Sequence, residues 1–173
     1  MVIERIIVGI LLFLSIKTYA QRSNIQLESI LMAHKIGTDT SLKKIILTNE
    51  QFLKEYTDGG GELIGYYKSK NIERILMKIY VSNGIETINY YFKNENLFFV
   101  LETFSTFKWD EKQEKFNRDE TTNSYDNRYC IKNDELVCQT MTKSNRYGNV
   151  KDLLSSVKQD SRDNLDLLKP HLK

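Results

Sequence analysis

The sequence predicts an α+β protein, mainly antiparallel β, in which a meander of about six strands is covered by a C-terminal amphipathic helix and by an N-terminal segment of mixed structure. Three observations lead to this fold class. Between residues 59 and 142, β-branched and aromatic residues alternate with polar ones, and short polar turns interrupt them. The stretch 90–97 recurs in similar form as 129–136, with a fainter copy at 66–72. From residue 149, apolar residues follow a helical period that closes at Pro170.

The clearest hairpin signal is Ser82-Asn83-Gly84-Ile85, since Asn-Gly suits the two positive φ angles of a type I′ turn. Pairing Ser82 with Ile85 brings apolar residues together on one face of the sheet: Ile79 opposite Ile88, Met77 opposite Tyr90, and Ile75 opposite Phe92. A turn at 93–96 keeps that face if Phe92 pairs with Leu97, Tyr90 with Phe99, and Ile88 with Leu101. A turn at 68–71 places Ile64 opposite Ile75.

This register predicts two faces of different character. The first face is a continuous apolar stripe and is expected to lie under the C-terminal helix, 149–169; it carries Ile75, Met77, Ile79, Ile88, Phe92, Leu97, Phe99 and Leu101. The second face is mixed, with Tyr67, Leu76, Tyr80, Tyr91, Phe98 and Val100 among Arg74, Lys78, Asn89 and Glu102. Either the N-terminal segment, 21–58, folds over this second face, or part of it binds a partner.

The N-terminal segment has three local signals. Residues 24–36 are expected to form a helix ended by Gly37, and residues 42–47 a strand. Thr48 and Gln51 form a capping box that opens a short helix. Within the meander, the charged stretch 109–120 is expected to be a loop between two strands.

Residues 1–20 have the layout of a cleavable signal peptide. An apolar run from Ile6 to Ile16 is too short for a membrane span, and the small residues Thr18 and Ala20 suit a peptidase. Cleavage leaves 153 of the 173 residues, a length that fits one globular domain, 21–173. Removing Arg5, Lys17 and Glu4 from the 25 basic and 23 acidic residues leaves 23 and 22, which is too balanced to attract nucleic acid. The expected location is the periplasm or the cell exterior, without a stable membrane span.

The segments Gly60-Gly61-Glu62-Leu63-Ile64-Gly65-Tyr66-Tyr67, Tyr90-Tyr91-Phe92-Lys93-Asn94 and Leu97-Phe98-Phe99-Val100 resemble those of an uncharacterised group of exported proteins and lipoproteins from Gram-negative bacteria. The resemblance covers roughly residues 58–142 and extends to Arg128-Tyr129. Its motifs describe strands and turns, so it implies a fold and carries over no activity.

No residue pattern predicts a catalytic, metal or cofactor site. His34 and His171 lie in separate segments without a ligand cluster, and the glycines at 59–61 precede a strand, unlike those of a phosphate-binding loop. Carboxylates in the stretch 109–120 alternate with basic residues, as on a solvated loop. Cys130 and Cys138 suit a disulfide in an exported protein, but a two-residue turn at Asn133-Asp134 points them to opposite faces, whereas a bulged loop brings them together.

We therefore expect a non-enzymatic binding or interaction protein without a cofactor, whose partner is a protein in the periplasm or outside the cell. The candidate partner surface consists of Tyr67, Arg74, Tyr80, Tyr91 and Phe98. A more specific alternative is an inhibitor or immunity protein against a secreted enzyme or toxin. A second alternative is an enzyme whose cleft is assembled across strands.

Overall fold

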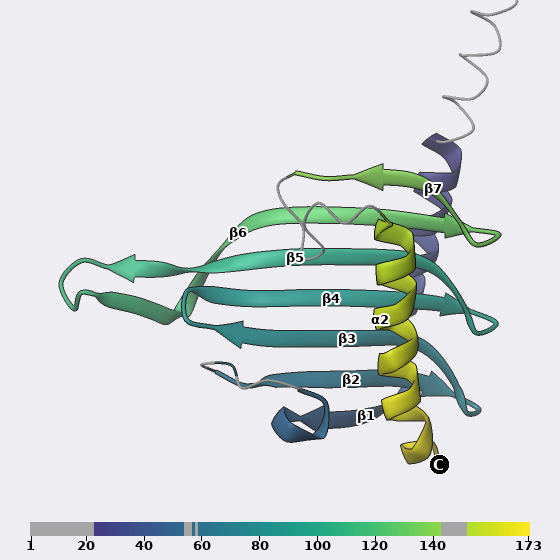
Figure 1. Cartoon of the computed structure of the whole chain (residues 1–173), viewed down its shortest axis with the longest axis horizontal. Helices are drawn as coiled ribbons and strands as arrows, with labels where there is room; N and C mark the ends of the chain where they lie inside the picture. Colours follow the sequence, from purple (N-terminus) through teal and green to yellow (C-terminus); the bar gives the residue numbers. More distant parts are fainter. Residues whose placement is uncertain (1–22, 54–56, 58, 143–151) are drawn as a thin grey trace, which may run out of the picture.

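The computed structural model describes residues 23–53, 57, 59–142 and 152–173, and it confirms the predicted α+β meander (Figure 1). One open antiparallel sheet contains all the strands in sequence order. They are β1 (Lys43–Thr48), β2 (Gly61–Lys68), β3 (Asn71–Val81), β4 (Gly84–Lys93), β5 (Asn96–Asp110), β6 (Lys115–Lys132) and β7 (Glu135–Thr140). Strands β2 to β7 make up the expected meander, and β1 is the strand expected at 42–47.

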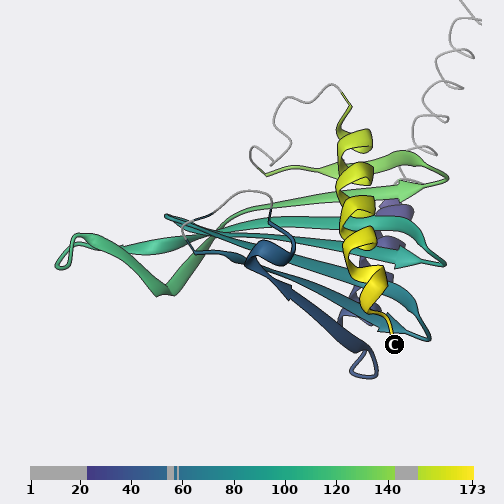
Figure 2. The same cartoon turned by 60° about the horizontal axis from the view of Figure 1, so that its bottom comes forward.

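Two helices lie on opposite faces of the twisted sheet (Figures 1 and 2). The N-terminal helix spans residues 23–37 and ends at Gly37, as predicted. Asp152 is the N-cap of helix α2 (Leu153–Leu168), and its side chain accepts a hydrogen bond from the Ser155 amide. The expected start at Asn149 lies outside the described residues. Pro170 falls in a 3₁₀ helix, η2 (Lys169–His171), directly after α2.

The first face of the sheet carries the main hydrophobic core, and α2 covers it as predicted. Val157 and Leu168 of α2 pack against a buried cluster that includes Leu63, Ile75, Met77, Ile88 and Tyr90. Gly65 permits the close approach of α2, because a Cβ at this position would lie 3.0 Å from a methyl carbon of Leu168. A 3₁₀ helix, η1 (Asn49–Gln51), follows β1, and the predicted capping box is present, with the Thr48 amide donating to the Gln51 side chain.

The N-terminal helix covers part of the second face. Its Ala33 packs in a smaller buried cluster with Tyr91, Phe99 and Cys130. The side chain of Gln26 adds a hydrogen bond to the Thr140 hydroxyl of β7, 3.1 Å long. These contacts fix the helix near the ends of β4 to β7.

Three hairpins share one turn and one irregularity. Their two-residue turns are Ser69-Lys70, Asn94-Glu95 and Asn133-Asp134, and all six residues have positive φ. After the second residue pair from each turn the register shifts, because Glu73, Phe98 and Val137 are extra residues in β3, β5 and β7. The three turns lie on one side of the sheet, where the strands end, and this side is called here the turn edge (Figure 1).

These bulges correct the predicted pairing and the predicted faces. Phe92 pairs with Leu97 as expected, but beyond the bulge Tyr90 pairs with Val100 and Ile88 with Glu102. Phe99 and Leu101 therefore belong to the second face, whereas Val100 and Glu102 belong to the first, opposite to the prediction. In the β2–β3 hairpin the same shift places Ile64 opposite Leu76 instead of Ile75.

The β3–β4 hairpin differs from its predicted register by two residues. Its turn residues are Ser82 and Asn83, and Val81 pairs with Gly84. A Cβ at Gly84 would collide with the backbone oxygen of Ser105 and lie 2.7 Å from the Phe104 ring, so this glycine serves the close approach of β4 to β5 instead of the turn. A shift of two residues preserves the faces, and Ile75, Met77 and Ile79 stay in the predicted core.

The stretch 109–120 is mostly strand, not the expected loop. Strand β5 continues to Asp110 and β6 starts at Lys115, so the turn is confined to residues 111–114. Because β4 pairs with β5 no further than Thr106, the rest of this hairpin projects from the sheet as an arm, residues 107–121 (Figure 1).

Candidate functional site

The predicted partner surface does not form one exposed patch. Tyr67 lies on the first face in the main core and is buried, because the β3 bulge at Glu73 places Gly65 opposite Ile75 and so turns Tyr67 to that face. Tyr91 is on the second face but is 7% exposed, packed in the cluster beneath the N-terminal helix. Phe98 is half-buried and packs against that cluster, while Arg74 and Tyr80 are also half-buried.

Arg74 is the most strongly held residue of that set. Its guanidinium carbon lies 4.8 Å from the centre of the Tyr66 ring and 5.7 Å from that of Tyr91. Nε and Nη2 both donate to the Asn89 side-chain oxygen, at 2.9 and 2.6 Å. Burial raises the pKa of Tyr91, and the charge of Arg74 opposes that rise. Arg74 therefore acts mainly as a packed link between β2, β3 and β4.

A buried carboxylate on the first face is the main polar feature of the core. Glu102 has no exposed surface and accepts hydrogen bonds from the hydroxyl of Tyr129 at 2.8 Å, the hydroxyl of Tyr125 at 3.2 Å, and the amide nitrogen of Asn127 at 3.4 Å. Burial, aided by the bond to Glu102, raises the pKa of Tyr129, so the phenol keeps its proton. These donors stabilise a carboxylate that cannot reach solvent, which indicates a structural role.

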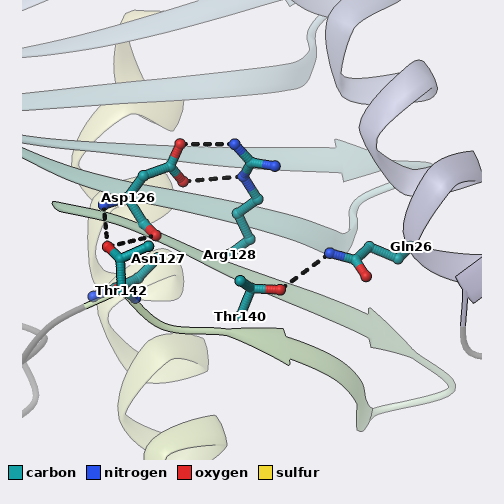
Figure 3. A network of polar contacts seen from close by, with 6 residues as sticks. All are labelled: Gln26, Asp126, Asn127, Arg128, Thr140 and Thr142. Carbon is teal, nitrogen blue, oxygen red and sulfur yellow. Dashed lines mark hydrogen bonds and ion pairs between the residues drawn. The ribbon is translucent and has the colours of Figure 1, made fainter.

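A second polar network ties residues 126–128 of β6 to Thr142, which follows β7 (Figure 3). Arg128 donates to both carboxylate oxygens of Asp126, at 3.0 and 2.8 Å. The Thr142 hydroxyl oxygen accepts a hydrogen bond from the Asp126 amide, and the Thr142 amide donates one to the side-chain oxygen of Asn127. The network continues the β6–β7 connection past the last strand pair, and Gln26 links β7 to the N-terminal helix (Figure 3).

Cys130 and Cys138 form a disulfide across β6 and β7, with their Cα atoms 4.9 Å apart. The expectation that a two-residue turn keeps them apart is wrong, because the turn has two residues and the bulge at Val137 still brings Cys138 opposite Cys130. Cys130 is fully buried in the second-face cluster.

The arm carries an aromatic pair beside its turn, of which Trp109 is exposed. Trp109 is 50% exposed and meets the half-buried Phe116 edge-on, with 5.1 Å between ring centres. At the base of the arm, the Phe107 amide donates to the Asn83 carbonyl, and Lys108 pairs with Glu120 at 2.9 Å. The pattern of strands did not reveal this site, because the charged residues around Trp109 are typical of a loop.

A groove of about 600 Å³ lies at the turn edge. One wall is the N-terminal helix, with Leu31, Met32 and Ile36, and the other is the start of β3 and the β4–β5 turn. Sequence patterns do not locate it, since it depends on how the helix crosses the sheet.

Among the described residues, no group of histidine, cysteine, aspartate and glutamate side chains is placed to hold a metal ion. Within the same residues, no helix is long and apolar enough to cross a bilayer. Comparison of the chain with models of protein families, with curated proteins and with solved structures finds no match.

Proposed function

We propose that the chain is an exported, non-enzymatic binding protein of the bacterial cell envelope, and that the tip of the β5–β6 arm contacts its protein partner. The observation that carries this proposal is the exposure of Trp109 on a hairpin that projects from the sheet. Tryptophan and its aromatic neighbours dominate the energy of protein interfaces, whereas a large exposed indole contributes little to a monomer.

Two further features support the proposal. The disulfide between Cys130 and Cys138 fits the oxidising compartments in which exported proteins reside. The one fully buried carboxylate of the described core, Glu102, is held by donors and shielded from solvent, so it is not presented to a substrate.

The test is capture of a partner from the envelope fraction of the native host, followed by titration of that partner. Trp109 is the sole tryptophan, so its fluorescence reports directly on burial of the arm tip. We expect a blue shift on binding and at least a tenfold loss of affinity in Trp109→Ala. Ile46→Ala is the matched control, because Ile46 is 55% exposed on β1, far from the arm in sequence. Equal affinity of Trp109→Ala and the wild type would contradict the role of the arm.

The arm also favours one second candidate, an inhibitor or immunity protein. A narrow hairpin with an aromatic tip fits a concave site, such as the cleft of a secreted enzyme or toxin. In that case the captured partner is such an enzyme, the protein inhibits it at equimolar concentration, and Trp109→Ala loses inhibition in proportion to affinity. A partner whose activity is unchanged in the complex would reject this candidate and leave the binding proposal standing.

A further inference from the structure

The groove at the turn edge continues beyond the N-terminal helix. A second hollow of about 340 Å³ shares Asn71, Ile72 and Glu95 with it and is walled on the other side by α2 and the residues that follow it. The two hollows therefore adjoin at the start of β3 and the β4–β5 turn, and together they outline an elongated path between the two helices. This shape suits an extended chain better than a compact molecule.

The floor of the path is apolar. Ile72 and Phe92 line it, and both belong to the main buried core. On the wall, Leu31 is 60% exposed and leaves apolar surface in contact with water. Glu73, the extra residue of the β3 bulge, also lines the groove. An apolar side chain placed on this floor would remove the exposed surface of Leu31 from water, whereas Ile72 and Phe92 are already buried and supply a packed surface beneath it.

The charges along the path change sign. Around the larger hollow, four carboxylates face two lysines, which leaves a net charge of about −2: Glu28, Asp39, Glu73 and Glu95 against Lys35 and Lys93. Glu28, Glu73 and Glu95 form no ion pair with any described residue, and Asp39 accepts the Ser41 amide. Around the smaller hollow the balance is about +1, from Lys70, Arg162 and Lys169 against Glu95 and Asp166.

From this geometry we propose that the groove binds an extended peptide segment of another protein, with a lysine or arginine at the acidic end and apolar side chains on the floor. The acidic end repels phosphate and carboxylate groups, which disfavours anionic ligands there. The site is at the opposite end of the sheet from the arm (Figure 1), so it goes beyond the proposed function and does not rest on it.

The experiment uses isotope-labelled protein and follows its amide NMR signals during titration with the peptide acetyl-Lys-Leu-Ala-Leu-Glu-amide. We expect saturable shifts confined to the residues around the two hollows, which are 28–39, 70–73, 92–95 and 162–172. The peptide acetyl-Glu-Leu-Ala-Leu-Glu-amide should bind at least fivefold more weakly, because its first side chain meets the carboxylates. Shifts that are absent, or that lie outside these residues, would overturn the proposal.

Two variants separate charge from packing. Glu28→Gln/Glu73→Gln should weaken binding of the lysine peptide about fivefold, and Leu31→Gln should weaken both peptides. Glu111→Gln/Glu114→Gln removes the same charge from the arm turn and should leave binding unchanged. Equal affinity for the two peptides, or no effect of the groove variants, would overturn the assignment. Trp109→Ala should retain peptide binding, so failure of the arm proposal and failure of this one are distinguishable.

Discussion

Reduction of the disulfide between Cys130 and Cys138 should lower the free energy of unfolding by about 2.5 kcal/mol. The two cysteines are eight residues apart in sequence, and closing a loop of this size removes roughly 8 cal/mol/K of entropy from the denatured chain, or about 2.5 kcal/mol at 25 °C. The bond joins β7, which lies at the edge of the sheet, to β6. Its loss should therefore loosen β7 before the rest of the sheet.

The assay is urea unfolding of the wild type with and without a phosphine reductant. Cys130→Ala/Cys138→Ala is the control, and its unfolding should not respond to the reductant. Because Cys130 is fully buried, this variant also loses packing and is not itself the measure of the bond. Equal stability with and without reductant would refute the entropy argument. Two alkylatable thiols in unreduced monomer would refute the bulge at Val137 as well.

Three further predictions test the packing, the buried cluster and the turns. Tyr91→Ala should cost about 3–5 kcal/mol in urea unfolding and the half-buried Phe98→Ala clearly less; equal losses would contradict the burial of Tyr91 by the N-terminal helix. Because folding raises the pKa of Tyr129, the free energy of unfolding should be constant below about pH 10 and fall as the pH rises above it. The fall should be less steep in Tyr129→Phe, and parallel pH profiles of the two proteins would contradict this. Glu95→Gly should raise the stability measured in thermal unfolding by up to about 1 kcal/mol, since Glu95 has a φ of 64°. Lys93→Gly in β4 should lower the stability, and a loss in both variants would reject the turn argument.

Local sequence signals predicted the elements well. The capping box at Thr48, the helix end at Gly37 and the turn at 93–96 all depend on side-chain chemistry within a few residues, and the structure confirms each. The alternation of apolar residues likewise placed Ile75, Met77 and Ile79 in the main core on the first face.

Pairing beyond the bulges could not be read from the same signals. A bulge inserts one residue without changing composition, so both Phe98 and Phe99 fit an uninterrupted strand. As a result Glu102 was expected on the mixed second face, whereas the structure buries it in the main core with Tyr129. The prediction of the partner surface was wrong for the same reason, because the face on which Tyr67 lies depends on how β2 pairs with β3.

The repeat within the sequence contains the information that was missing. The bulge at Val137 corresponds to those at Phe98 and Glu73, since each extra residue lies three positions after the last residue of its turn. A bond between Cys130 and Cys138 demands the bulge in the last hairpin, because paired residues on an unbulged two-residue hairpin would point the two sulfurs to opposite faces. Given that bond, the similarity of the three hairpin sequences predicts the same bulge in the other two hairpins. A thiol count therefore tests all three registers, and with them the faces to which Phe99 and Glu102 belong.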